Sequence, residues 1–141
     1  MKYVVDSSVA IKWVLAEKDD AKARTLREES RKGVHELVAP DVFTTELAHA
    51  LTRAERQKRI TPGDALVLWT DVMTTSPKLH QSVPLTPRAI EISSQFHIGV
   101  YDCLYIALAE REQCEFITAD DRLVRNLQSA FPMILALSSK P

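Results

Sequence analysis

The chain is poor in the residues that build several common kinds of site. It has only 3 glycines in 141 residues, which leaves no glycine-rich loop to hold a phosphate or a dinucleotide. Its two cysteines, Cys103 and Cys114, form no CxxC pair, and its 4 histidines are scattered rather than set in an HExxH motif. No serine lies in a GxSxG motif. A disulfide framework, a zinc enzyme of the usual kind and a serine hydrolase are therefore not predicted.

A strong net charge and long apolar runs are also absent. The formal net charge is -1, so any contact with nucleic acid must come from local basic clusters rather than from bulk attraction. No apolar stretch approaches the roughly 20 residues that a membrane span needs. Asp6 and Lys12 also interrupt the apolar start before it reaches the length of a signal peptide. We therefore expect a soluble cytoplasmic protein without a membrane partner.

Short apolar runs alternate with helical patterns along the whole chain. Strands are expected at about residues 2–5, 35–39, 79–83, 115–118 and 133–137. Helices are expected at about 7–14, 19–32, 41–59, 61–75 and 86–96, from about 101 onward, and at 121–131. This alternation predicts an α/β fold with three layers, α/β/α, around a mostly parallel sheet of about five strands. Neither the length nor the composition suggests a linker, so one domain spanning 1–141 is expected.

Three helical segments carry more detailed signals. Asp41 follows Pro40 and is expected to cap the helix that begins there. Thr61-Pro62 is expected to open the next helix, with Asp64 as the partner of the capping threonine. The seven nonpolar residues 103–109 predict a helix that is buried on more than one face.

Four acidic residues lie where one element of the chain gives way to another, or within a helix that follows. Asp6 comes directly after the first strand and Asp120 after the fourth, while Glu46 and Asp102 lie on helices. Because open α/β folds place their sites at the carboxyl ends of parallel strands, we expect the four carboxylates to converge there. Converging carboxylates repel one another and favour a hard cation, most simply Mg²⁺ or Mn²⁺.

Each acid, taken alone, also has a structural explanation. Asp6 and Asp120 could cap the helices that follow them, and Asp102 could complement a helix dipole from the first turn. Glu46 is harder to explain in this way, because it lies beside His49 on the flank of an apolar stripe. From that flank its carboxylate can reach around the edge of the core toward the sheet.

Four stretches of the chain resemble the signature blocks of PIN-domain proteins. They are VVDSSVAIKWVL (4–15), ELAHAL (46–51), YDCLYIALAE (101–110) and TADDRL (118–123). The blocks stand in the family's order and near its spacing, and the resemblance covers essentially the whole chain. Single short blocks arise by chance, but the four together are specific. Within the family, the chain is most similar to the VapC-type ribonuclease toxins of prokaryotic toxin–antitoxin pairs.

The resemblance implies a catalytic metal site made by Asp6, Glu46, Asp102 and Asp120. It implies Mg²⁺ or Mn²⁺ as cofactor, in a site of one or two ions that shields the charge of the scissile phosphate. The reaction would be endonucleolytic hydrolysis of RNA that leaves 5′-phosphate and 3′-hydroxyl ends. Such proteins usually form homodimers and are silenced by a cognate antitoxin, so these two partners are expected in addition to RNA.

The resemblance also implies supporting residues around the acids. Ser8 and Thr118 match hydroxyl positions that orient the acids, although ordinary turn bonding or capping explains them equally well. Asp121 stands where the family varies, and either supports the site or only faces solvent. His49 departs from the family, in which asparagine is common three residues after the glutamate.

Basic residues near the acids are candidates for contact with RNA phosphates. Arg53, Arg122 and Lys12 are the predicted RNA-binding residues. Other cations of the same segments are Arg56, Lys58, Arg59 and Arg125. For Lys58 and Arg59 a solvated helix end is an equal explanation. Trp13 and Trp69 are interpreted as core residues in preference to base-stacking ones.

Two other functions fit the sequence less well than the nuclease. A phosphoacceptor receiver domain fits poorly, because it needs an acidic pair after the first strand and this chain has the single Asp6. The stronger alternative is a catalytically silent PIN module that binds RNA or an antitoxin without cutting. The complete set of four mutually repelling acids argues against that alternative.

Overall fold

One parallel sheet of five strands forms the centre of the computed structural model, which describes residues 1–141. The strands are β1 (Lys2–Val5), β2 (Glu36–Pro40), β3 (Lys78–His80), β4 (Glu115–Thr118) and β5 (Ile134–Ala136). Their order across the sheet is β3-β2-β1-β4-β5, and every neighbouring pair is parallel. The predicted α/β fold with about five parallel strands is confirmed.

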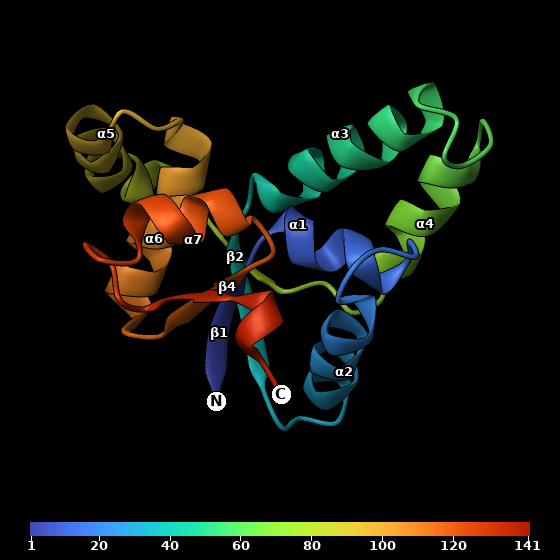
Figure 1. Cartoon of the computed structure of the whole chain (residues 1–141), viewed down its shortest axis with the longest axis horizontal. Coiled ribbons are helices and arrows are strands. Elements are labelled where there is room, and N and C mark those ends of the chain that lie inside the picture. Colours follow the sequence, from blue (N-terminus) through green and yellow to red (C-terminus); the bar gives the residue numbers. More distant parts are fainter.

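Helices cover both faces of this sheet. They are α1 (Ser7–Ala10), α2 (Asp20–Arg31), α3 (Phe43–Arg56), α4 (Asp64–Met73), α5 (Thr86–Phe96), α6 (Val100–Glu112) and α7 (Asp121–Leu127), with short 3-10 turns η1 (Ile11–Trp13), η2 (Val83–Leu85) and η3 (Leu137–Ser139). Figure 1 shows α5, α6 and α7 on one side of the sheet and α1 to α4 on the other, which gives the three expected layers. None of these helices combines the length and the apolarity that crossing a membrane requires.

Two predicted helix starts were wrong. Asp41 does not cap α3, because its backbone N–H still donates to the carbonyl of His80 (2.8 Å) and its carboxylate accepts a hydrogen bond from Ser82. The segment after β2 therefore stays tied to the end of β3, and α3 begins at Phe43. α4 begins at Asp64, three residues later than expected.

The turn before α4 explains its late start. The carboxylate of Asp64 accepts hydrogen bonds from the backbone N–H (2.9 Å) and the hydroxyl (2.6 Å) of Thr61, so the predicted pair does form. However, Gly63 adopts φ +95°, in the left-handed region that glycine enters at little cost. Residues 61–63 consequently form a turn instead of the first turn of a helix.

Three other elements are shorter than predicted. The first helical segment ends as the 3-10 turn η1 at Trp13, and α7 ends at Leu127 instead of about residue 131. The third strand was expected to reach residue 83, but Val83 and Pro84 belong to η2. Pro84 lacks the N–H that continuing a strand in the sheet would use.

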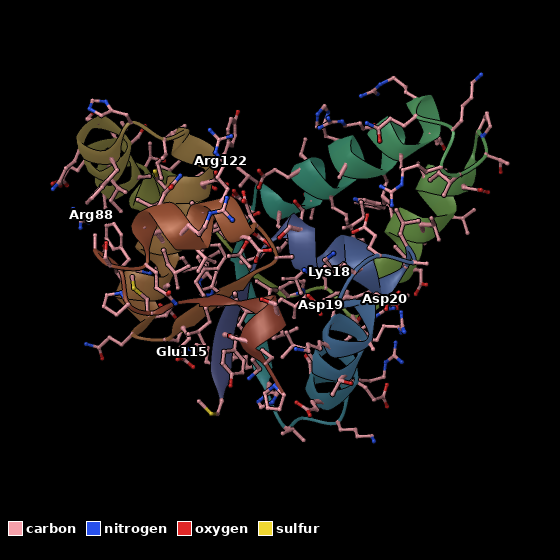
Figure 2. The ribbon with its side chains drawn as sticks, in the orientation of Figure 1. Lys18, Asp19, Asp20, Arg88, Glu115 and Arg122 are labelled. Atoms are coloured by element: carbon pink, nitrogen blue, oxygen red, sulfur yellow. The ribbon has the colours of Figure 1, made fainter.

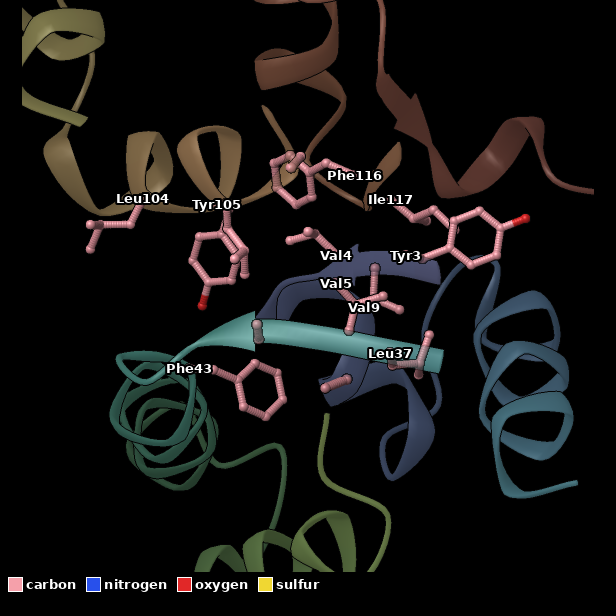
Figure 3. Close-up of a cluster of buried hydrophobic side chains, with 14 of the residues drawn as sticks. Tyr3, Val4, Val5, Val9, Leu37, Phe43, Leu104, Tyr105, Phe116 and Ile117 are labelled. Atoms are coloured by element: carbon pink, nitrogen blue, oxygen red, sulfur yellow. The ribbon is translucent and has the colours of Figure 1, made fainter. Parts of the chain in front are cut away.

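Helix α6 is the most extensively buried of the helices, as its sequence predicts. All seven residues 103–109 are buried, and the ring of Tyr105 stacks on that of Phe116 in β4, with 5.7 Å between centroids. Figure 3 shows Tyr105 extending from α6 into the cluster formed by the apolar side chains of β1 and β4. The helix that carries Asp102 is thus fixed against the sheet by packing along its length.

The direction in which successive strands are added to the sheet reverses between the neighbouring strands β1 and β4. From β1 the chain continues to β2 on one side, and from β4 it continues to β5 on the other. In parallel α/β sheets, the carboxyl ends of the strands at such a point leave a crevice in which ligands bind. Val5 pairs in register with Ile117, which brings the next residues, Asp6 and Thr118, side by side at this point.

Candidate acidic active site

Asp6 is buried at the end of β1 and is held by three hydrogen bonds. Its Oδ1 accepts from the Ser8 hydroxyl (2.5 Å) and from the N–H of Val9 (3.3 Å), and its Oδ2 accepts from the Thr118 hydroxyl (2.6 Å). Only 8% of the residue is exposed. This burial raises the pKa of Asp6 to about 6, against the opposing effect of the hydrogen bonds. The carboxylate is therefore rigidly placed without a positive partner.

The two hydroxyls that hold Asp6 also join the ends of β1 and β4. The Ser8 hydroxyl accepts from the N–H of Ala119 (2.9 Å), and the Thr118 hydroxyl accepts from the N–H of Asp120 (3.1 Å). The Ser8–Ala119 and Thr118–Asp6 contacts join the ends of the two neighbouring strands, whereas the Thr118–Asp120 contact is an ordinary local turn bond. Ser8 and Thr118 thus lie where the resemblance implies, in direct contact with an acid of the site.

Asp120 caps α7, and Asp102 lies in the first turn of α6. The Oδ1 of Asp120 accepts from the N–H groups of Arg122 and Leu123 (both 3.1 Å), while its Oδ2 has no partner within the chain. Asp102 makes no side-chain hydrogen bond or ion pair. Burial and the nearby charge of Asp120 raise its pKa. The capping explanation is thus correct for Asp120, and also for Asp6, which caps α1. Capping leaves the second oxygen of Asp120 free to bind a ligand.

Glu46 reaches the site from α3 and is held by a tyrosine. The Tyr105 hydroxyl donates to its Oε1 at 2.6 Å. Burial and the charge of Asp102 raise the pKa of Glu46. Burial and these acidic neighbours raise the pKa of Tyr105 far above its ordinary value, so its hydroxyl stays protonated and donates. Sequence reasoning missed Tyr105, although a hydroxyl inside the apolar run of α6 was a signal that a buried partner exists.

The four acids form a charged group without a compensating cation. Asp102 raises the pKa of both Asp6 and Glu46 by its charge, and none of the four acids takes part in an ion pair within the chain. No three His, Cys, Asp or Glu side chains lie close enough together to hold one metal ion between them. Mg²⁺ is commonly held by one or two carboxylates together with water and substrate phosphate, so these donors fit such an ion.

Two cavities open beside the acids. The larger, of about 860 Å³, is lined by Glu46, His49, Arg53 and Tyr101, together with Ser7, Ile11, Val42, Thr45, Ala50, Gln57 and Arg59. The smaller, of about 620 Å³, is lined by Asp102, Asp120 and Arg122, together with Phe96, His97, Ile98, Gly99, Leu123, Asn126 and Leu127. The sequence placed Glu46 on the flank of the apolar stripe of α3, and this flank faces the larger cavity.

The three predicted RNA-binding cations lie in different surroundings. Arg53 and Arg122 are exposed, line the larger and the smaller cavity respectively, and form no ion pair within the chain; Arg122 is labelled in Figure 2. Lys12 is half-buried and its ammonium lies 3.2 Å from Glu17, whose other oxygen binds Arg59 at 2.7 Å. Lys12 lines neither cavity, so the structure brings two of the three cations to the acids.

The exposure of the remaining candidate residues shows whether they face solvent or the core. Asp121 is exposed and its side chain makes no hydrogen bond, as expected of an acid that only faces solvent. Trp13 is buried, and Trp69 packs against the core with its indole N–H bonded to the carbonyl of Thr44 (3.0 Å). The exposed aromatic residue at the site is instead Tyr101, which sequence reasoning missed.

Comparison with known proteins identifies the family. The family model described as PIN domain matches residues 3–126. The chain is 32% identical to the VapC ribonuclease Mb0985 of Mycobacterium bovis over 133 residues, which cover 92% of this chain and 94% of the relative. Ribonuclease VapC12 of Mycobacterium tuberculosis is 31% identical over 124 residues, with 87% and 90% covered. The chain belongs to the PIN domain family.

Solved structures agree on the fold. The crystal structure of PAE2754 from Pyrobaculum aerophilum is similar with a TM-score of 0.71 and 18% identity, covering 99% of this chain and 94% of that one. VapBC2 from Rickettsia felis, solved bound to a DNA fragment from its promoter, gives a TM-score of 0.64 at 14% identity, covering 96% and 97%. The predicted membership of the PIN family, including the likeness to VapC ribonucleases, is confirmed.

Proposed function

We propose that the chain is a metal-dependent endoribonuclease and the toxin of a type II toxin–antitoxin pair, acting as one domain over residues 1–141. The proposal rests on four neighbouring carboxylates whose negative charge no side-chain cation neutralises. They belong to Asp6, Glu46, Asp102 and Asp120, and they lie where the strand order reverses between β1 and β4. The names of the relatives, which are VapC ribonucleases, support the same reaction.

The acids have separate parts in this proposal. An Mg²⁺ or Mn²⁺ ion would supply a positive charge beside the scissile phosphate and lower the pKa of the attacking water. Asp102 and the free oxygen of Asp120 are available as ligands because neither has another partner. Asp6 is already oriented by Ser8 and Thr118, so binding the ion costs it little further ordering. No covalent intermediate on the protein is needed.

Glu46 approaches the site from the larger cavity, whereas Asp102 and Asp120 line the smaller one. It lies on α3, lines the larger cavity, and keeps one oxygen free of the bond to Tyr105. The resemblance implies that such a carboxylate helps to hold an ion or its bound water, and its free oxygen could also accept a proton from the attacking water. Its raised pKa, due first to burial, makes it a stronger base than an ordinary glutamate.

The cations and partners follow from the same geometry. Arg53 and Arg122 lie on the two sides of the acids and would each neutralise an RNA phosphate, whereas Lys12 is engaged by Glu17. The structure of VapBC2 from Rickettsia felis supports a cognate antitoxin as partner for this chain. We include a homodimer and a cytoplasmic location in the proposal, in keeping with the family resemblance.

Cleavage of total RNA tests the function directly. Purified protein freed of antitoxin is incubated with RNA that contains intact tRNA and rRNA, in Mn²⁺ or Mg²⁺ and in EDTA, beside Asp102→Asn. Discrete cuts that need the ion, carry 5′-phosphate ends and are absent with the variant are the expected result. A protein that binds Mn²⁺ with neither cuts nor RNA binding would contradict the proposal.

The competing function is a silent module that binds RNA or an antitoxin. It predicts the same binding of partners without cuts, and no binding of Mn²⁺. Absence of both cleavage and Mn²⁺ binding in the experiment above would favour the silent module. The four acids without a cation make that result the less expected one.

A further inference from the structure

The first turn of α6 separates the two cavities beside the acids. Tyr101 lines the larger cavity, and its neighbour in the chain, Asp102, lines the smaller one. Glu46 belongs to the larger cavity and Asp120 to the smaller. A polymer that contacts both Glu46 and Asp120 would therefore cross this turn and enter both cavities.

The larger cavity combines an aromatic ring with apolar walls and a free cation. Tyr101 is 60% exposed, in contrast to Tyr105 one turn later, which is 1% exposed. Ile11 and Ala50 supply apolar wall, and the exposed Arg53 makes no ion pair within the chain. Proteins that bind single-stranded nucleic acid use this combination, in which a base stacks on the ring and a cation meets the backbone.

The smaller cavity has a different chemistry. Arg122, Asn126 and His97 bring polar groups to it beside the acids. Its aromatic residue, Phe96, already packs edge-to-face against Phe131, with 5.3 Å between centroids. This cavity therefore offers hydrogen bonds to a nucleotide and, apart from the smaller imidazole of the exposed His97, no free ring on which to stack a base.

We propose that Tyr101 is a base-stacking residue of the site, so that the base of the nucleotide next to the cut bond of the RNA stacks on its ring. Arg53 meets the phosphate of that nucleotide, and the nucleotide on the other side of the cut enters the smaller cavity. This inference rests on the proposed ribonuclease function and specifies its substrate. A base within a duplex has both faces covered by its neighbours, so paired segments are not cut.

Kinetics on a short synthetic RNA tests the stacking. The oligonucleotide is chosen to contain one bond that the wild-type protein cuts. Because stacking on an aromatic side chain is worth about 1–3 kcal/mol per base, Tyr101→Ala should raise KM about five-fold or more, with kcat changed less. Tyr101→Phe keeps the ring and should behave as wild type. Arg53→Ala removes the cation that meets the phosphate and should also raise KM. Its matched control is Arg56→Ala, because Arg56 is exposed on the same helix and lines neither cavity.

Changing the RNA identifies the base that stacks. An abasic site next to the cut should raise KM for the wild-type protein to the value found for Tyr101→Ala. The same abasic RNA should show little further loss with Tyr101→Ala, because the contact is already missing. A complementary strand that pairs the whole oligonucleotide should abolish cleavage. Equal cleavage of the duplex, or equal KM for Tyr101→Ala and wild type, would overturn the inference.

Photo-cross-linking separates this inference from the function on which it rests. A single-stranded RNA containing 5-iodouridine is bound to the protein in Mn²⁺, irradiated, and the adduct is mapped by mass spectrometry. An adduct at Tyr101 without any cleavage would support the base-binding site and contradict the nuclease. Cleavage with adducts only elsewhere would support the nuclease and overturn the site. Weakened binding of the cognate antitoxin to Tyr101→Ala, with RNA kinetics unchanged, would reassign the cavity to a protein partner.

Discussion

At the scale of single residues, Asp6 shows how a structural contact and a functional one can be the same contact. Its carboxylate caps α1, receives two hydroxyls and still lacks a positive charge nearby. Stability and function therefore make opposite demands on its ionisation. The fold favours the neutral acid because the site is buried, while a metal ion requires the carboxylate.

The stability of the metal-free protein should consequently depend on pH through Asp6. The unfolded chain ionises this group near its ordinary pKa of 3.8, but the folded protein does so at about 6. Between these values the folded state binds more protons, so the free energy of unfolding falls as pH rises from about 4 to 6, by about 3 kcal/mol. Below pH 4 and above pH 6 this contribution is constant.

Denaturation by urea in EDTA at a series of pH values measures this effect. Asp6→Asn should show a smaller fall between pH 4 and 6, because only Glu46 and Asp102, whose pKa values burial also raises, still contribute to it. The variant should be at least as stable as wild type at pH 7, because asparagine also caps helices well. Asp121→Asn is the control, since Asp121 is exposed and unpartnered. A wild-type profile that is flat across this range would contradict the prediction.

Tyr105 is the second residue whose hydroxyl has a specific task. Tyr105→Phe removes the donor to Glu46 and keeps the ring that stacks on Phe116. Because a hydrogen bond to a charged group is worth about 1.5–3 kcal/mol, we expect cleavage to fall roughly ten-fold or more while the fold is retained. The measurement is kcat/KM on a short RNA, with circular dichroism to check the fold.

Two further variants make this test selective. Tyr3→Phe removes a hydroxyl that lies beside Met1 and Lys140, away from the acids, and should leave cleavage unchanged. In Glu46→Gln protein, adding Tyr105→Phe should cost little more, because the tyrosine acts through the glutamate. Additive losses in the double variant would assign Tyr105 a role independent of Glu46.

At the scale of elements, α6 joins the core to the site. Its residues 103–109 are all buried, and its first turn carries Tyr101 and Asp102. Rigid packing at one end of the helix thus fixes the position of functional groups at the other. The sequence already indicated this burial, because seven consecutive nonpolar residues leave no polar face.

A cavity made in this helix should therefore destabilise the whole fold. Leu108 is fully buried, and Leu108→Ala should lower the free energy of unfolding by about 2–5 kcal/mol. The same substitution at the 71%-exposed Leu66 in α4 should change it by no more than about 0.5 kcal/mol. Urea unfolding of both variants measures the difference. Similar losses at the two positions would contradict the burial of α6.

The elements also show which features the sequence could and could not predict. Alternating strands and helices, and the four acids beside them, follow from local patterns and were found. The start of α3 depends on a bond between Asp41 and His80, which lie far apart in the sequence, so a capping rule failed there. That Tyr101 stays exposed beside a cavity depends on how α6 packs against its neighbours, and a local pattern does not contain that information.

At the scale of the whole molecule, a bound ion should link the two halves of the chain. Asp6 and Glu46 come from the first half, Asp102 and Asp120 from the second, and without an ion their charges repel. A ligand that binds only the folded state stabilises it, by about 2.7 kcal/mol at a concentration of 100 times its Kd. Mn²⁺ should accordingly raise Tm, and EDTA should reverse the change.

Asp102→Asn provides the comparison. Without metal the variant should be as stable as wild type or more stable, because one repelling charge is gone and Asp102 has no hydrogen-bond partner to lose. With Mn²⁺ its Tm should rise less than that of wild type. Thermal unfolding by differential scanning fluorimetry gives both values. Marked destabilisation of the metal-free variant would show that Asp102 has a structural role instead.

The central position of the first strand has a consequence for synthesis on the ribosome. β1 pairs with β4 in the finished sheet, so Asp6 emerges early but waits for more than a hundred further residues before Thr118 can bind it. Asp102 and Asp120 are among the later residues to emerge. A nascent chain therefore has no assembled acidic cluster until residues 118–120 have left the ribosome. The order of the strands thus delays assembly of the acidic cluster, and under the proposed function this delay gives a co-produced antitoxin time to bind.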